Sequence, residues 1–591
     1  MAGIRKVAGD VLDSFKRDPN ARAIPSGVIR DDDKPWDMED AYEATARSPL
    51  AKQLKARHLQ MIAIGGAIGA GLFINTGTAL ATAGPGSLVI AFIIAGVAMY
   101  CTVQALGEMA VLFPVAGSFS AYSTRFLDPA WGFAMGWNYV LQNLSVIPLE
   151  LVAASIAADY WAKNSISNAV WITIYFVMLC VVNCMDVRMY GEVEFVFTTI
   201  KVVAILGFII FALVIDVGGG PNGHFIGGMF WRNPGAFLNG FKGFSTVIST
   251  ALFAYEGTEL VGLCAAETKY PRQSIPPAVR QTFWRITFCY VISIIMVGLI
   301  VSADDQQLLA TPASAAGDPT VSPFIIAIKN AGVKGLDSVF NAVILLAIFE
   351  VGNSALYAST RTLTALAEQR QAPHFLAYID RHGRPVASVL VSLVVALLAY
   401  LGSTSSVAQV DVLIWLTTIS SLASIFTWGS ICLCHVRFRR AWIYQGHSLD
   451  ELAFKSSVGT VGSWVAIAIY LFFLVLQLWI AIAPIGYGDM SASARATNFF
   501  QLYLAVPFIA IFYGVYKILM RTRVVHKDNM NLSIGVLKLT LEQIREEEWA
   551  KRAQPPWWKK ITTHTPSHPF WKPRSDDLEM DWGFRAASAA E

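Results

Sequence analysis

The chain alternates long apolar segments with short polar connections. A helix that crosses the hydrocarbon core of a bilayer needs about 20 mostly apolar residues. Twelve segments reach or approach that length: 59–81, 87–112, 130–160, 168–186, 193–216, 244–266, 283–303, 337–360, 385–402, 410–434, 463–483 and 499–519. The pattern predicts an all-α integral membrane protein with twelve transmembrane helices, which we call spans 1 to 12.

Glycine interrupts two of the spans. Span 1 reads LQMIAIGGAIGAGLFINTG over residues 59–77, and each glycine costs a helix about 1 kcal/mol relative to alanine. Span 6 reads TALFAYEGTELVGLCAAE over 250–267, with Gly257 close to two glutamates. Because unwound backbone survives in a membrane only around a cavity or inside protein, corresponding interruptions point to a binding site. The two spans open two five-helix halves, 59–216 and 244–434, so the interruptions correspond. Close packing of small residues is the alternative.

Basic residues fall unevenly on the connections between spans. An even number of spans places both tails, residues 1–58 and 520–591, on one side, with spans 11 and 12 (463–519) after the second half. The connections on the tail side carry 13 Lys and Arg residues, and those on the other side carry six. The positive-inside rule therefore predicts that both tails are cytoplasmic. The first 58 residues are polar and do not resemble a cleaved signal peptide.

Composition supports a membrane protein and excludes several classes of function. The chain has 591 residues, of which 55% are hydrophobic and 15% are charged, against about one quarter charged in soluble domains. Its seven cysteines lie in apolar runs, which argues against disulfides. No GxxxxGK[ST] motif is present, which speaks against an ATP-driven pump. No redox or metal constellation is seen, so we expect no cofactor, no metal site and no enzyme activity.

A helix split at mid-membrane offers a binding site for a zwitterion. The N–H groups at the start of its second half suit a carboxylate, and the carbonyls at the end of its first half suit an ammonium group. Two such helices together would receive an α-amino acid. The predicted contacts are, for the carboxylate, the backbone of Ile68, Gly69, Ala70 and Gly71, and, for the amine and side chain, Phe253, Ala254, Tyr255, Glu256, Gly257 and Thr258.

Several long motifs resemble those of one family. They include ARHLQMIAIGGAIGAGLF (56–73), ALGEMAVLFPVAGSF (105–119), YGEVEFVFTTIKV (190–202), FAYEGTELVG (253–262) and VGNSALYASTRTLTALAEQ (351–369). In these stretches the chain resembles fungal plasma-membrane amino-acid permeases of the amino acid–polyamine–organocation superfamily, and among them the general amino-acid permeases. The resemblance covers about residues 56–460. It implies a leucine-transporter-type fold, with a 5+5 inverted repeat and discontinuous helices 1 and 6, and proton-driven uptake.

Five charged residues inside spans are candidates for function, because an ionisable group in a membrane is costly. Lys201 in span 5 either snorkels to the cytoplasmic end or, as the resemblance implies, bridges spans 1 and 8 where sodium symporters hold Na⁺. The resemblance makes Glu150 in span 3 part of the substrate and proton site; a structural hydrogen bond is the alternative. Glu108 and Glu267 are expected to be structural or gating carboxylates. Glu259 is expected to cap the second half of span 6, with proton carriage as the alternative.

Two acids depart from the family pattern. Glu256 stands where close relatives usually carry a small or amide residue, and Glu350 stands where general permeases usually carry serine. Asn353 and Tyr357 follow Glu350 by one and two helical turns. If both acids line the pocket, the pocket is more negative and binds amino acids with cationic side chains more favourably. If Glu350 turns toward a neighbouring helix, nothing follows for selectivity.

The sequence therefore predicts a symporter that imports L-amino acids with H⁺ across the plasma membrane by alternating access, with broad specificity. The alternatives are a permease that prefers cationic amino acids and an amino-acid sensor with low flux. A channel is disfavoured, because a channel is expected to have a ring of polar residues and not two broken helices. Expected partners are the substrate, protons, the bilayer and cytosolic ubiquitin-ligase or trafficking factors at the tails, and no nucleic acid. Lys6, Lys16, Lys34 and Lys52 on the tail are candidate modification sites, with lysines of a solvated tail as the default interpretation.

Overall fold

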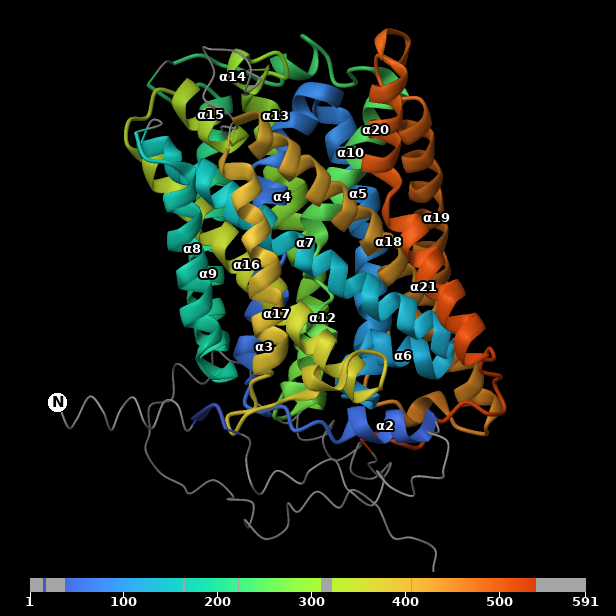
Figure 1. Cartoon of the computed structure of the whole chain (residues 1–591). Helices are drawn as coiled ribbons and strands as arrows, with labels where there is room; N and C mark the ends of the chain where they lie inside the picture. The colour runs from blue at the N-terminus through green and yellow to red at the C-terminus, as the bar shows by residue number, and fades with distance from the viewer. Residues whose placement is uncertain are drawn as a thin grey trace, which may run out of the picture. The chain divides into compact units, whose positions relative to one another are not determined.

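The computed structural model describes residues 14–16, 38–162, 165–221, 223–309, 322–404 and 406–537 (Figure 1). Lys6, Lys34 and residues 538–591 lie outside these ranges. Within them the regular structure is helical, apart from one isolated bridge between Leu54 and Thr268. The all-α fold that the sequence predicts is therefore confirmed.

The helices have the following bounds: α2 (Met38–Ala46), α3 (Ala56–Gly65), α4 (Ala70–Phe73), α5 (Asn75–Leu112), α6 (Phe119–Phe126), α7 (Pro129–Ala162), α8 (Asn168–Asn183), α9 (Val187–Asp216), η1 (Met229–Trp231), α10 (Gly240–Tyr255), α11 (Leu260–Leu263), η2 (Cys264–Glu267), α12 (Pro271–Arg285), the π-helix η3 (Ile286–Ile292), α13 (Ser293–Ile300), α14 (Gln306–Leu309), α15 (Pro323–Asn330), α16 (Leu336–Glu368), η4 (His374–Ala377), α17 (Val386–Ala396), η5 (Leu397–Ser403), α18 (Ser406–Tyr444), η6 (Leu449–Glu451), α19 (Gly459–Ile482), η7 (Tyr487–Asp489), α20 (Ala492–Tyr503) and α21 (Ala505–Met520).

Most of the predicted spans are membrane-capable helices. In the described part of the chain, nine helices are long and apolar enough to cross a bilayer, and the pair α20–α21, bent by 58°, makes a tenth. Helix α8 is apolar but has only 16 residues. Span 1 is divided among α3, α4 and the start of α5. Each of the twelve predicted segments thus contains helix, while the count of twelve crossings stays a prediction.

Spans 1 and 2 are joined by a sharp corner and not by the loop expected between residues 81 and 87. The chain stays helical up to Gly84, which adopts φ 79° and ψ 165°, and Pro85 follows at once. A Cβ atom at Gly84 would lie 2.7 Å from the carbonyl oxygen of Ala236. The corner therefore needs a residue that tolerates positive φ and has no side chain, and only glycine offers both.

The described parts of the two tails meet at one end of the helices. In Figure 1, α2 and α6 lie at that end, and α14 and α15 lie at the opposite end. Arg125 of α6 donates to the carbonyl of Ile534 at 2.9 Å, and the N–H of Ala116 donates to the carbonyl of Thr45 at 3.0 Å. Both tails thus begin at the same end, as an even number of crossings requires.

Burial separates a central helix from a peripheral one. The most apolar window of α7 is 89% buried, whereas that of α9 is only 33% buried. One face of α9 carries exposed apolar side chains such as Val203 and Ile210, which suit lipid. Its other face buries Thr198 and Lys201. That polar face packs toward α3 and α16 and contributes to the site described next.

Candidate functional site

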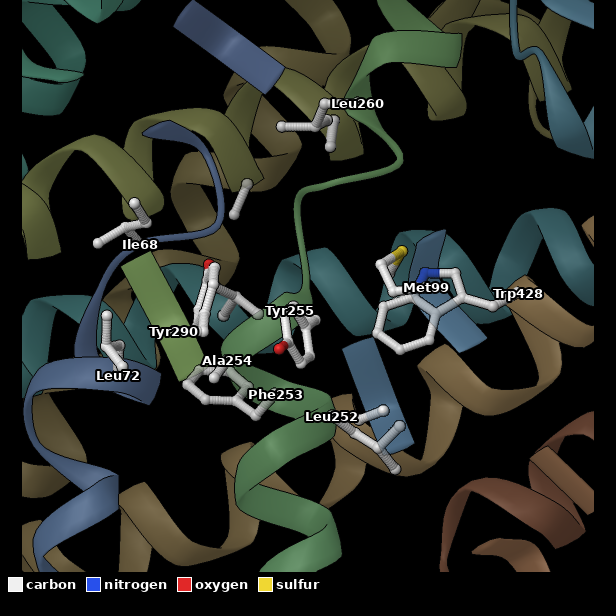
Figure 2. Packing of buried hydrophobic residues seen from close by; sticks show 14 of the residues in the cluster. Ile68, Leu72, Met99, Leu252, Phe253, Ala254, Tyr255, Leu260, Tyr290 and Trp428 are labelled. Carbon is white, nitrogen blue, oxygen red and sulfur yellow. The ribbon is translucent and has the colours of Figure 1, made fainter. Parts of the chain in front are cut away.

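The helix breaks that the sequence predicts in spans 1 and 6 are both present, and they touch. Residues 66–69 separate α3 from α4, and residues 256–259 separate α10 from α11. Figure 2 shows the unwound strand of chain between Tyr255 and Leu260. A Cβ atom on Gly257 would lie 2.2 Å from the carbonyl oxygen of Gly66, so the two breaks are in direct backbone contact.

The first break leaves a short row of backbone donors free. The N–H of Ile68 is occupied, because it donates to the carbonyl of Gly65 at 3.1 Å. Among the described residues, no backbone carbonyl pairs with the N–H of Gly69, Ala70 or Gly71. These three predicted residues therefore have N–H groups without a backbone partner at the start of the second half of the helix, and that of Ala70 faces the Glu150 carboxyl, whereas Ile68 donates to Gly65.

The second break leaves one carbonyl free. The carbonyl of Phe253 accepts from the N–H of Glu256 at 3.2 Å, and that of Tyr255 accepts from the hydroxyl of Thr258 at 2.7 Å. No donor in the described ranges reaches the carbonyl of Ala254. Of the three carbonyls predicted to receive an amine, Ala254 is thus the one without an internal partner.

Glu259 holds the second break in shape. Its carboxyl accepts from the N–H of Gly257 at 3.3 Å, from the Tyr139 hydroxyl at 3.1 Å and from the Trp428 indole at 3.2 Å. The side chain is buried. Because Gly257 has φ 87°, the chain there cannot continue the helix, and the Glu259 carboxyl satisfies the donor that the turn exposes.

A small cavity lies between the breaks, α7 and α16. The centre of a water-sized sphere can occupy about 20 Å³ of it, which is room for about one water molecule. A larger ligand fits only after the walls separate. The lining includes six predicted residues, Gly69, Gly71, Glu150, Phe253, Glu256 and Gly257, together with Gly66, Ala67, Asn143, Val146, Leu260, Val351, Ser354 and Ala355.

Two carboxyl groups in this lining have spare acceptor capacity. The Glu150 carboxyl faces the N–H of Ala70, but neither oxygen has a hydrogen bond of normal geometry within the described chain. Glu256 accepts from the Ser420 hydroxyl at 2.6 Å through Oε2, while its Oε1 has no described partner. No lining residue is basic. The cavity is therefore suited to a positively charged group or a proton.

Lys201 ties the first break to α16. Its ammonium donates to the carbonyls of Gly65 at 2.6 Å and Ile68 at 2.9 Å, and forms an ion pair with Glu350 at 2.9 Å. The lysine is fully buried. It thus satisfies carbonyls that unwinding releases and lies between spans 1 and 8, instead of reaching toward solvent.

Two predicted pocket residues turn away from the cavity. Glu350 faces α9, where its carboxyl also accepts from the Thr198 hydroxyl at 2.5 Å. Asn353 donates to Glu194 at 3.2 Å. Neither lines the cavity, and the reason is helical phase: at 100° per residue, Val351 faces the cavity while its neighbour Glu350 points to α9. Glu350 therefore does not contact a ligand in the cavity.

Glu194 is a buried acid beside the site, outside the cavity lining, that the sequence analysis missed. Its carboxyl accepts from Asn353 and from the Ser354 hydroxyl, both at 3.2 Å. The signal that would have found it is spacing, because Glu194 precedes Lys201 by seven residues and so shares its helix face.

Glu267 connects the end of span 6 to α16. It accepts from the Tyr357 hydroxyl at 2.5 Å and from Arg361 at 3.1 Å, which ties the end of span 6 to α16. The Tyr357 ring also stacks on Tyr190 of α9 with centroids 4.6 Å apart. At the same end, the Glu108 carboxyl accepts two hydrogen bonds from the Arg439 guanidinium, at 2.7 and 2.5 Å.

The described residues contain no group of three or more His, Cys, Asp or Glu side chains that could hold a metal ion. The free polar groups of the site are instead unpaired N–H donors on one side and unpaired oxygens on the other. Such an arrangement is chemically suited to a small molecule that carries both charges.

The chain is similar to several known proteins. A family model described as "Amino acid permease" matches residues 58–529. A general amino-acid permease of Candida albicans is 47% identical over 556 residues, which are 93% of this chain and 92% of that protein. A general amino-acid permease of Saccharomyces cerevisiae is 42% identical, covering 93% of this chain and 90% of its own. A cationic amino acid transporter of Schizosaccharomyces pombe is 45% identical, covering 84% and 83%. The crystal structure of a manganese transporter from Eremococcus coleocola aligns with 86% of this chain and 97% of its own, at 15% identity and a TM-score of 0.46.

Proposed function

Because the chain belongs to the amino acid permease family, we propose that it imports L-amino acids together with protons across the plasma membrane. The observation that carries the proposal is the contact of two broken helices around a cavity with unpaired backbone donors and acceptors. No enzymatic step is involved, since the ligand crosses the membrane unchanged.

The amino acid binds through its two charged groups. Its carboxylate takes the N–H groups of Gly69, Ala70 and Gly71, which also carry the positive end of the helix dipole. Its ammonium takes the carbonyl of Ala254 and the free oxygen of Glu256. Both groups of the substrate are then satisfied by partners that the breaks leave open, which offsets the loss of hydration.

Proton coupling is assigned to Glu150 and Lys201. Glu150 faces the cavity without a hydrogen bond of its own, so it can exchange a proton when the cavity opens. Lys201 supplies the fixed positive charge beside the first break, at a place where a Na⁺ ion would otherwise find two carbonyl oxygens. This arrangement favours protons over Na⁺ as the driving ion.

Alternating access explains why the cavity is so small. With room for about one water, the cavity does not accommodate an amino acid in this conformation. Opening toward the α2 end requires the Glu267–Arg361 pair and the Glu267–Tyr357 hydrogen bond to separate, because both tie the end of span 6 to α16. Rocking of spans 1 and 6 against α7 and α16 would open each side in turn.

A second candidate is a preference for amino acids with cationic side chains. Two observations favour it: Glu150 and Glu256 both face the cavity with unpaired oxygens, and no lining residue is basic. One relative is named a cationic amino acid transporter. Glu350 no longer contributes to this argument, because it points to α9.

The tails are assigned to the cytoplasm, since the connections on their side carry the larger number of Lys and Arg residues. Trafficking factors and ubiquitin ligases would then act there. Location in the plasma membrane is inferred from the resemblance to fungal plasma-membrane amino-acid permeases, and surface labelling tests it.

Reconstitution of the purified full chain into liposomes tests the proposal. An inward pH gradient should drive accumulation of labelled amino acids, and a protonophore should abolish it. Glu150→Gln should lose proton-driven accumulation. Uptake that follows a Na⁺ gradient, or that ignores the pH gradient, would refute proton coupling. A panel of twenty competing amino acids then decides between broad and cationic selectivity.

A further inference from the structure

Two carboxyl groups are buried in the cluster around Lys201. Glu194 of α9 and Glu350 of α16 are both fully buried. Thr198, one turn after Glu194, donates to Glu350 at 2.5 Å, and Asn353, one turn after Glu350, donates to Glu194 at 3.2 Å, so the two side chains face each other across the contact of α9 with α16. Glu350 forms the ion pair with Lys201, whereas Glu194 has no ion pair among the described residues and accepts from neutral groups of Asn353 and Ser354.

The burial of two carboxyl groups beside one ammonium requires a proton. An ionised carboxylate is an acceptor only, so two of them cannot hydrogen-bond to each other. One oxygen of Glu194, Oε2, has no described donor. A proton on that oxygen turns it into a donor toward Glu350 and removes a negative charge that would otherwise be buried without compensation, which is very costly.

The charge count leads to the same conclusion. One ammonium, that of Lys201, faces two carboxyls of the pair, and a neutral cluster needs one of them protonated. The titratable groups around the pair are Lys201 and Tyr190 on α9, Glu150 on α7, Cys264 in η2, Cys289 in η3 and His58 on α3, which turns to Glu192. The nearest further cation, Arg361 on α16, forms its ion pair with Glu267 at 3.1 Å and not with Glu194.

We propose that Glu194 and Glu350 together hold one exchangeable proton and form a second proton-binding site of the transporter, in addition to Glu150. The inference rests on the proton coupling proposed above. It also links the proton to the substrate site. When the proton leaves, two carboxylates attract Lys201, whose ammonium then binds the carbonyls of Gly65 and Ile68 less tightly, and the first break loosens.

The variant Glu194→Gln distinguishes a proton-binding role of Glu194 from a purely structural role. Glutamine keeps an acceptor for Asn353 and Ser354 and a donor for Glu350, so it resembles the protonated state permanently. The variant should bind and exchange substrate but move one proton fewer. Glu368→Gln serves as the matched control, because it changes a buried carboxyl of α16 that accepts from Ser48, outside the cluster.

The measurement is made in liposomes held at zero membrane potential. Each coupled proton contributes about tenfold accumulation per unit of inward pH gradient, since 1.4 kcal/mol corresponds to a factor of ten. Glu194→Gln should lower accumulation by that factor and leave counterflow exchange, which needs no net proton movement, at the wild-type rate. The control should match the wild type in both assays.

Three results would overturn the inference. Unchanged accumulation in Glu194→Gln would show that the pair moves no proton. A parallel loss of accumulation and counterflow would assign the pair to structure. Glu350→Gln repeats the test where Glu194→Gln does not fold, and failure of both to fold would show that the native pair is not neutral. A wild type without pH-driven accumulation would refute the proposed coupling itself, independently of the variants.

Discussion

Replacing Gly257 by alanine tests whether the two helix breaks depend on each other. Gly257 has φ 87°, and its missing Cβ atom leaves the space that the carbonyl of Gly66 fills. In the alanine variant that atom would lie 2.2 Å from this oxygen, which belongs to backbone and cannot rotate away. The methyl group therefore has to push one broken helix away from the other.

The size of the effect follows from the geometry. Ordinary contact with a Cβ begins at 3.4 Å, so the breaks must separate by about 1.2 Å from the present 2.2 Å. A displacement of about 1 Å at reacting or binding groups lowers a rate by roughly 100-fold, equivalent to about 2.7 kcal/mol. Left-handed backbone adds about 1–2 kcal/mol for a residue with a side chain. We expect the uptake rate of Gly257→Ala to fall at least about 100-fold.

Initial uptake of a labelled amino acid, divided by the amount of protein at the cell surface, measures this loss. Gly335→Ala is the matched control, because Gly335 has φ 85° but no atom within 4 Å of a Cβ placed there. It carries the same backbone strain without the collision, and its uptake should stay near that of the wild type. If Gly257→Ala transports as well as Gly335→Ala, the breaks do not need their contact and the site geometry argued here is wrong.

Three further variants probe the site. Gly69→Val would place a Cβ 2.6 Å from Val351, so uptake should be lost while surface delivery persists; normal uptake would remove Gly69 from the carboxylate site. Glu256→Ala should raise the KM for cationic amino acids more than for neutral ones in competition assays, and equal losses would end the selectivity argument. Lys201→Met leaves the buried Glu350 without its cation, which typically costs about 3–5 kcal/mol; thermal unfolding of the purified variant should show it, and an unchanged Tm would contradict the ion pair.

The predicted membrane segments and the helical structure correspond well, because an apolar run near 20 residues has few alternatives to a helix. The segment boundaries correspond less well where no polar residue marks them. Residues 82–86 read TAGPG, a sequence typical of a loop. In the structure Gly84 instead forms a sharp kink at which one helix follows directly on the other. The short helices α2 and α6 also have no clear sequence signal, since their burial depends on contacts with the tails.

The backbone geometry of the site could be predicted from the sequence, whereas the orientation of its side chains could be predicted only in part. Unwinding is a local property that glycine spacing reveals, and both breaks fall at the glycines. The orientation of α16 was not accessible, because its most apolar window is 72% buried and apolar periodicity then gives no phase. Glu350 and Val351 are adjacent in sequence, and only the packed structure shows which one faces the cavity.

Glu194 marks the boundary between what spacing can show and what it cannot. Glu194, Thr198 and Lys201 fall at i, i+4 and i+7, which places them on one face of a helix whose opposite face is apolar. From spacing alone one would predict an ion pair between Glu194 and Lys201 within this helix. In the structure Lys201 instead pairs with Glu350, 149 residues further along the chain. Glu194 accepts from the neutral groups of Asn353 and Ser354, and by our proposal it shares a proton with Glu350. Protonation in this permease is then a property of the whole cluster, because exchanging a partner of Lys201 changes which carboxyl must be neutral. We therefore expect that a serine at position 350 frees Lys201 for Glu194 and removes the need for the shared proton.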